Sequence, residues 1–135
     1  MIKLSKEKPY EDACKILGLR PVANYKSYKL TDETRNFIKL ETVAKALNEG
    51  WKPTTIDPKE VRYYVWGWNY TDNRKPSGLL LVVSGSGLSY ADAGVGTSLE
   101  FKDEDTAKEF ARMCKPMIVK YLFGRDDHEN FKFDF

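Results

Sequence analysis

The sequence predicts an α+β fold: an antiparallel sheet of about three strands, packed with N-terminal helices and one long C-terminal helix that a proline kinks or splits. Two observations support this prediction. Apolar residues recur at the helical period near both ends of the chain, and they alternate at period two in its middle. The 135 residues suit one domain, which we expect over residues 1–123, with residues 124–135 as a C-terminal tail or an edge strand.

Two helices are expected in the first 50 residues. The first covers residues 9–18, where Pro9 suits the first helical position and Gly18 suits the C-terminal end. The second follows Thr31, a typical N-cap residue, and carries apolar residues at helical spacing until Gly50. Residues 19–30, between the two helices, contain no acidic residue and predict an extended loop.

The middle of the chain predicts the strands. Residues 79–84, LLLVVS, are apolar on both faces and favour a central strand, joined to the preceding strand by a hairpin. Residues 97–102 predict the third strand, with Leu99 and Phe101 facing inward and Glu100 facing outward. The first strand, over residues 62–70, places a row of aromatic rings on one face: Tyr64, Trp66, Trp68 and Tyr70.

This aromatic face has two interpretations. In the first, at least Trp66 and Trp68 pack beneath the helices as part of the core. In the second, an open face of the sheet presents rings that stack on bases or anchor a partner protein. The second interpretation remains open because a small sheet with few helices can leave one face uncovered.

A final helix is expected from Asp103, its N-cap, to about residue 123. Pro116 lies in its interior and should kink it or split it into two pieces. Cys14 and Cys114 each lie in a helical apolar pattern, without a CxxC motif. They are therefore expected to be buried, reduced thiols, with a disulfide or a structural zinc as the alternatives.

The glycine-rich stretch SGSGLSYADAGVG, residues 84–96, resembles a phosphate-binding loop at first sight. A Walker loop requires GxxxxGK[ST] before a helix, whereas here no lysine follows the glycines and a predicted strand comes next. We interpret the stretch as a connection between strands, with Tyr90 and Asp92 at its tip. His128 lies in a charged segment without a catalytic partner pattern. We therefore expect no enzyme, no cofactor and no metal site.

Charge and hydropathy limit the classes of partner. The net charge of +2 does not by itself predict a polyanionic ligand. The longest apolar run, LLLVV, is too short to span a bilayer, and the first residues contain no apolar segment typical of a secretion signal. We expect a cytoplasmic protein without membrane contact, and a homo-oligomer remains open.

Two kinds of binding partner are expected. The first is an unidentified protein, held by a few aromatic anchors through protein–protein contacts. The C-terminal FKFDF loosely resembles the acidic, phenylalanine-ended tails of bacterial and phage single-stranded-DNA-binding proteins. The candidate residues for this partner are Tyr90, Asp92, Phe131, Phe133 and Phe135.

The alternative partner is single-stranded nucleic acid. Cations neutralise phosphates and aromatic rings stack on unpaired bases, so a loop rich in both residue types is a candidate interface. The candidate residues are Arg20, Tyr25, Lys26, Tyr28 and Lys29 of the predicted loop, together with Trp66 and Trp68 of the aromatic strand.

Several blocks between residues 10 and 122 stand out together: YEDACKILG, ALNEGWKP, RYYVWGW, GLSY, VGTSLEFKD and AKEFARM. In this order they resemble a family of small uncharacterised proteins encoded by Bacteroidota, their phages and their mobile elements. The sequence differs at Val65, where proline is typical, and at Glu100, where cysteine is typical, and residues 124–135 extend beyond the usual end. The resemblance implies a phage or mobile-element accessory protein, and the missing cysteine argues further against a metal site.

Overall fold

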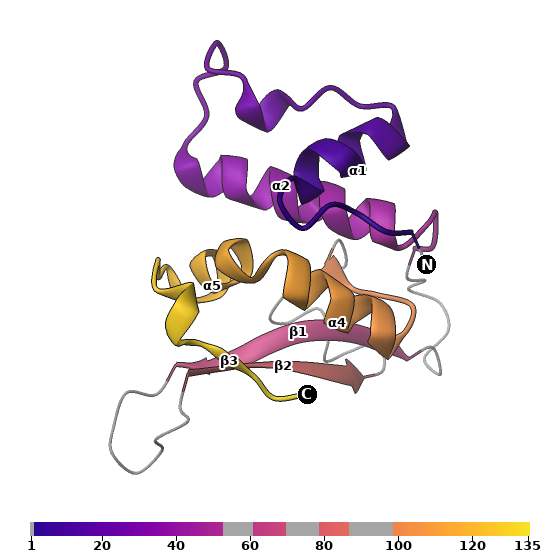
Figure 1. Cartoon of the computed structure of the whole chain (residues 1–135), viewed down its shortest axis with the longest axis vertical. Helices are drawn as coiled ribbons and strands as arrows, with labels where there is room; N and C mark the ends of the chain where they lie inside the picture. Colours follow the sequence, from indigo (N-terminus) through magenta and orange to yellow (C-terminus); the bar gives the residue numbers. More distant parts are fainter. Residues whose placement is uncertain (1, 53–60, 70–78, 87–98) are drawn as a thin grey trace.

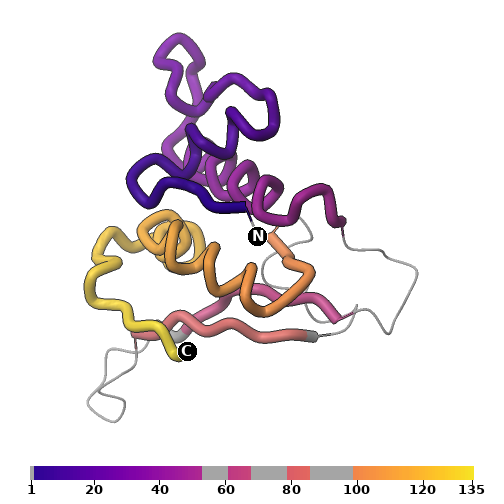
Figure 2. The backbone as a smooth tube through the Cα atoms, turned by 45° about the vertical axis from the view of Figure 1, so that its right-hand side comes forward, coloured from indigo at the N-terminus to yellow at the C-terminus, as the bar shows by residue number. Residues whose placement is uncertain are grey.

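A computed structural model describes residues 2–52, 61–69, 79–86 and 99–135. The described elements form three layers, in which two helices lie over a second pair of helices and the second pair covers one face of a sheet (Figure 1). Figure 2 shows the same order of layers from another side. In chain order the elements are α1 (Pro9–Leu17), the 3₁₀ turn η1 (Val22–Asn24), α2 (Asp32–Leu47), β1 (Arg62–Asn69), β2 (Leu79–Ser86), α4 (Glu104–Met113), α5 (Lys115–Phe123), the 3₁₀ turn η3 (His128–Asn130) and β3 (Lys132–Phe133).

Local sequence signals set the ends of α1 and α2, and the prediction of both helices is confirmed. Pro9 lies in the first turn of α1, and Gly18 ends that helix in the left-handed conformation with φ of 68°. The Thr31 hydroxyl oxygen accepts a hydrogen bond from the Thr34 amide at 3.1 Å, as an N-cap residue should. At the other end of α2 the C-cap is Asn48, and Gly50 follows it with φ of 89°.

The sheet is mixed, so the prediction of a purely antiparallel sheet is wrong. β1 and β2 pair antiparallel, from Arg62 opposite Ser86 to Asn69 opposite Leu79. β3 lies beside β2 in the parallel direction, with Leu80 opposite Lys132. Because α4 and α5 carry the chain across the sheet between β2 and β3, the C-terminal segment can return parallel to β2, which a hairpin does not allow. Of the two alternatives predicted for residues 124–135, a tail or an edge strand, the structure has the edge strand.

The strand predicted over residues 97–102 is also corrected. Within its described part, residues 99–102, the structure has a single antiparallel bridge, between Tyr63 and Phe101. The chain turns into α4 directly after it, with the Asp103 carboxylate accepting a hydrogen bond from the Thr106 amide at 2.7 Å. The pairing cannot continue past residue 102, because Asp103 already caps α4, and residues 97–98 lie outside the described residues.

The C-terminal helix is two helices rather than one long one. α4 ends at Met113 and α5 begins at Lys115, with Pro116 in the first turn of α5. Proline has no amide hydrogen to donate to the preceding turn, so it is favoured at a helix start and disfavoured in a helix interior. Of the two effects expected of Pro116, splitting is the one observed.

The hydrophobic core lies between the layers. Leu40 of α2, Phe110 of α4 and Leu81 of β2 are each at most 2% exposed. The two cysteines, Cys14 and Cys114, are buried free thiols, as predicted, and burial raises the pKa of Cys114 to about 12. A void of about 10 Å³ beside Leu40 and Phe110 holds no more than about one water molecule and is too small for a ligand.

Trp66, in the aromatic row of β1, does not lie beneath the helices. Val65 is 4% exposed and lies against α4 and α5. Because alternate strand residues point to opposite faces, Trp66 lies on the other face, where its indole N–H donates to the Ser84 hydroxyl at 2.7 Å. The interpretation that Trp66 packs under the helices is therefore wrong. The Trp68 side chain and Tyr70 lie outside the described residues.

A charged pair is fully buried at the start of β1. Arg62 Nη1 is 3.5 Å from both carboxylate oxygens of Glu100, and neither side chain has any exposed surface. The Asn48 side-chain amide donates to the Glu100 carbonyl oxygen at 2.9 Å. The alternation pattern predicts an outward-facing Glu100, which is wrong, and its burial is explained by the cation that β1 supplies. The contacts join the end of α2, the start of β1 and the segment before α4.

Breaking this buried pair should be costly. Glu100→Ala removes the Glu100 carboxylate from beside the fully buried Arg62 guanidinium, so the free energy of unfolding is expected to fall by about 3–5 kcal/mol in urea denaturation. The apolar double variant Arg62→Met/Glu100→Leu should recover much of the loss. Lys102→Ala is the control, because it removes a half-exposed ion pair with Glu49 and should cost less than about 1 kcal/mol. Equal losses in Glu100→Ala and Lys102→Ala would contradict the expectation.

Gly67 lies where β1 meets both β2 and α5. A β-carbon there would lie 2.3 Å from the Leu80 carbonyl oxygen and 3.1 Å from the Phe123 ring. Since the nearer neighbour is backbone, Gly67→Ala should lower the free energy of unfolding by about 1–3 kcal/mol in urea denaturation. Gly85→Ala is the matched control, because its nearest neighbour is the movable Tyr63 ring at 2.7 Å. A greater loss in the control would show that the backbone contact does not decide the effect.

Candidate functional site

The three C-terminal phenylalanines pack against their own chain. Phe131 is 1% exposed and stacks on Phe123, with ring centroids 5.3 Å apart. Phe133 is half-buried and packs against the core, and its ring lies 5.0 Å from that of Phe135. Phe135 is 39% exposed. Of the proposed tail anchors, Phe131 is therefore inaccessible to a partner, and Phe135 presents the most ring surface.

Cations of α4 and α5 cover these rings. Lys115 Nζ lies 5.2 Å from the centroid of Phe133, and Lys108 and Arg112 lie 5.8 and 5.3 Å from that of Phe135. Cation–π attraction thus holds the segment along the two helices, and it is an ordered edge of the sheet.

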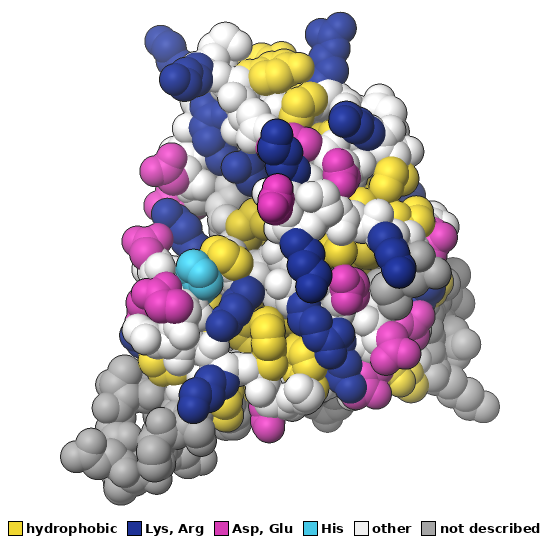
Figure 3. All heavy atoms as spheres, viewed as in Figure 1, with side chains coloured by type: hydrophobic (Ala, Val, Ile, Leu, Met, Phe, Trp, Pro, Cys, Tyr) yellow, Lys and Arg dark blue, Asp and Glu magenta, His cyan; other side chains and the backbone are white. Residues whose placement is uncertain are grey.

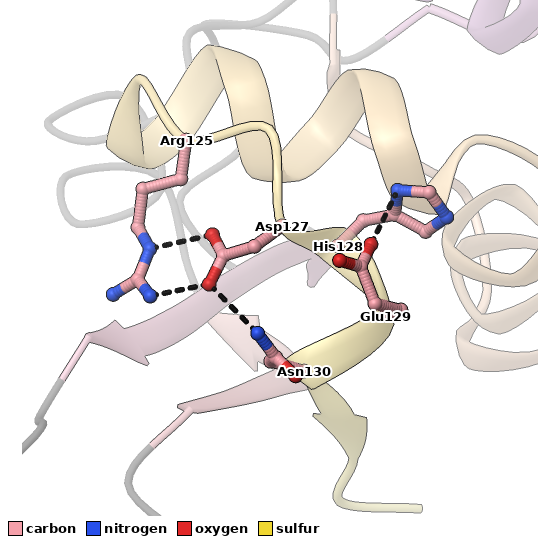
Figure 4. Close-up of polar contacts among 5 residues, drawn as sticks. All are labelled: Arg125, Asp127, His128, Glu129 and Asn130. Atoms are coloured by element: carbon pink, nitrogen blue, oxygen red, sulfur yellow. Dashed lines mark hydrogen bonds and ion pairs between the residues drawn. The ribbon is translucent and has the colours of Figure 1, made fainter.

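A polar corner turns the chain from α5 to β3 (Figure 4). The Arg125 guanidinium donates to both carboxylate oxygens of Asp127, and the Asn130 amide donates to one of them at 3.1 Å. Arg125 also lies 5.4 Å from the centroid of the Phe131 ring. The hydrogen bonds from Arg125, and then from Asn130, hold the pKa of Asp127 well below its usual range. The corner therefore fixes the buried Phe131 in place.

The same corner contains His128, for which the sequence predicts no catalytic role. Its Nδ1 lies 3.5 Å from a Glu129 carboxylate oxygen, and both side chains are exposed. Effective general bases are held in a packed site and have a pKa near the working pH, whereas the Asp127 carboxylate has a strongly lowered pKa. Within residues 2–52, 61–69, 79–86 and 99–135, no three His, Cys, Asp or Glu side chains are arranged to hold a metal ion. Nothing in the corner's geometry favours a catalytic role.

The loop between α1 and α2 is held firmly in shape. Arg35, in the first turns of α2, donates from Nη1 to the carbonyl oxygens of Ala23 at 2.8 Å and Tyr25 at 3.1 Å, and from Nη2 to that of Tyr28. From α1, the Tyr10 hydroxyl oxygen accepts a hydrogen bond from the Ala23 amide at 3.1 Å. Part of the segment forms η1, so the loop is more compact than the extended loop predicted.

The loop displays stacked rings and cations. Tyr25 and Tyr28 stack with ring centroids 5.8 Å apart and ring planes 20° apart, and Tyr28 is 48% exposed. Arg20, Lys26 and Lys29 are exposed, and no ion pair within the described part of the chain involves them. Figure 3 shows Lys and Arg side chains on both sides of hydrophobic ones at the upper end of the molecule, where this loop lies in Figure 1.

The residues proposed for nucleic acid are divided between two places. The loop lies at one end of the molecule and the sheet with Trp66 at the other, with the helices between them (Figures 1 and 2). One ligand-binding site therefore cannot combine the loop with Trp66. Tyr90 and Asp92 lie outside the described residues. Arg35, which shapes the loop, was not singled out in the sequence analysis. The sequence feature that could have identified it is an arginine in the first turns of the helix that follows the loop.

No protein-family model, curated protein or solved structure matches this chain significantly. Among the described residues, no helix has the length and hydrophobicity needed to cross a membrane.

The polar corner predicts a pH dependence of stability. Because the pKa of folded Asp127 is lowered, its contribution is fully present above the unfolded-state pKa of about 3.9 and is lost as pH falls through the folded-state pKa. The stability difference between the wild type and Asp127→Asn should be constant down to about pH 5 and shrink below it, in urea unfolding at a series of pH values. Asp126→Asn, at a carboxylate 87% exposed, is the control and should change stability less. A difference that grows on acidification would contradict this assignment.

Proposed function

We propose that the protein is a non-enzymatic binding protein whose ligand is single-stranded nucleic acid, held by the loop of residues 20–30. The observation that carries this proposal is the loop itself. Hydrogen bonds from Arg35 fix its backbone, it contains no acidic residue, and it presents a stacked tyrosine pair beside exposed cations. Cations that neutralise phosphates and rings that stack on bases are the two features of sequence-tolerant binding to single strands.

The charge environment of the loop supports a polyanion. Arg20, Lys26 and Lys29 form no ion pair with described residues, whereas Lys108 and Arg112 of α4 contact Glu104 and Glu109. An unpaired, exposed cation gains most from a phosphate, because nothing has to be displaced except water and counterions. The loop is thus a better phosphate site than the basic side chains of α4.

A protein partner bound by the C-terminal phenylalanines is favoured less. Phe131 is buried, Phe133 is half-buried, and the surface of Phe135 is shared with Lys108 and Arg112. A hot-spot anchor must transfer exposed apolar surface into the partner, and most of this surface is already buried within the chain. If no nucleic acid binds, a protein partner becomes the leading alternative.

The proposal also concerns the biological context of the protein. The sequence blocks that resemble small Bacteroidota phage and mobile-element proteins support an accessory role in such an element, in the cytoplasm of the host cell. Single-stranded intermediates arise wherever such elements copy or transfer their genomes, so the proposed ligand is consistent with that setting.

The loop cations provide the test. Lys26→Ala/Lys29→Ala should weaken binding of a fluorescent oligothymidylate of about 15 nucleotides in an anisotropy titration at low salt. The plot of log K against log salt should become shallower by about 1.4, which is about 0.7 for each phosphate that the variant no longer neutralises. Lys45→Ala/Lys52→Ala is the matched control, with the same charge change at two exposed lysines away from the loop, one in the last turn of α2 and one beyond it. Absent or salt-independent binding, or equal effects of the two double variants, would overturn the proposal.

A further inference from the structure

Resting on the proposed function, we propose that the exposed face of the Tyr28 ring is a stacking site for one unpaired base, and that Arg35 is the residue that positions this ring. The inference concerns which group of the ligand the loop recognises. It rests on two observations: the Tyr28 ring has exposed surface, and hydrogen bonds hold the backbone that carries this ring.

Tyr25 and Tyr28 form the beginning of a stack. Tyr25 is half-buried and covers one face of Tyr28, while Tyr28 keeps 48% of its surface exposed. Their centroid distance of 5.8 Å and interplanar angle of 20° match the offset arrangement that aromatic rings prefer. A base added on the open side of Tyr28 would continue this stack, with Tyr25 as its support.

Neighbouring cations suit the phosphates on either side of such a base. Lys26 and Lys29 are exposed and flank Tyr28 in the chain, two residues before it and one residue after it. Successive phosphates of an extended strand lie on both sides of each base, so one ring between two cations matches a nucleotide and its neighbours. In a duplex the base faces stack on each other and only their edges are accessible in the grooves. The ring therefore selects unpaired bases.

Arg35 connects this stacking site to the rigid part of the protein. Its guanidinium binds the carbonyl oxygens of both Tyr25 and Tyr28, so the backbone positions that carry the two rings are tied to one planar group. It also binds the Ala23 carbonyl oxygen, which extends the support to η1. A lysine would keep the charge but has no planar fork to bind carbonyl oxygens in these directions. Arg35 is thus a positioning residue and need not touch the ligand.

The first experiment separates the ring from the charge. Tyr28→Leu keeps the backbone carbonyl that Arg35 binds and removes only the ring. Its affinity for a single-stranded oligothymidylate of about 15 nucleotides should fall about tenfold, while any affinity for a duplex of the same length should not change. Tyr28→Trp is the matched variant that keeps a stacking ring and should retain single-strand affinity.

The second experiment tests positioning. Arg35→Lys should lower single-strand affinity several-fold and leave the salt dependence unchanged, because it removes no phosphate contact. In the Arg35→Lys background, Tyr28→Leu should cost less than in the wild type, since the ring is no longer held in place. Arg112→Lys, at an exposed arginine of α4, is the control and should show no such coupling.

The outcomes distinguish this inference from the proposed function. If Tyr28→Leu has no effect while Lys26→Ala/Lys29→Ala weakens binding, or if duplex and single strand bind equally, the stacking site is wrong and nucleic-acid binding stands. If Arg35→Lys unfolds the protein in circular dichroism, or shows no coupling to Tyr28, the positioning role is overturned. If no oligonucleotide binds, the proposed function fails and the inference fails with it.

Discussion

The packing of the layers depends on the buried contact between Arg62 and Glu100. A charge removed from water is tolerated where an opposite charge and hydrogen-bonding groups surround it. Arg62 begins β1, and Glu100 directly precedes Phe101, whose backbone exchanges two hydrogen bonds with Tyr63. A shift of one residue in this pairing would turn Arg62 to the opposite side of the strand and leave the Glu100 carboxylate buried without it. The ion pair therefore specifies the register in which β1 meets the chain before α4.

Helix α2 connects the buried contact between Arg62 and Glu100 to the loop of residues 20–30. Its C-cap, Asn48, donates to the Glu100 carbonyl oxygen, and near its other end Arg35 binds the loop carbonyls. The helix has 16 residues and is therefore about 24 Å long. A loop attached to a helix whose far end is held in the core has little freedom to lose when a ligand binds. The loop's shape thus belongs to the unliganded protein and does not have to be created by the ligand.

The sequence predicted the helix ends well because caps are local: Thr31 and Asp103 cap the helices that follow them. It failed where a distant partner decides the outcome. Period-two alternation does not show which face of β1 the helices cover. The position of Gly67 does show it, because only a small residue on the helix-covered face leaves room for the Phe123 ring. An edge strand was one of the two alternatives predicted for residues 124–135, but its parallel pairing with β2 depends on the helical crossover. Likewise, loop composition alone predicted an extended loop, whereas the shape of the loop depends on Arg35 of the next helix.

The distribution of charge along the chain is consistent with the proposed binding of single-stranded nucleic acid. Residues 1–50, which include the loop, contain ten basic and seven acidic residues, whereas residues 103–135 contain six basic and eight acidic ones. This asymmetry favours approach of a polyanion from the loop end of the molecule. Three loop cations release few counterions, so charge alone would give weak binding that salt easily removes. Stacking on a ring already held in place adds affinity that salt does not screen, and it does so only for bases that are unpaired. The proposed site would therefore distinguish single strands from duplexes by ring geometry instead of by charge, in a protein whose net charge is only +2.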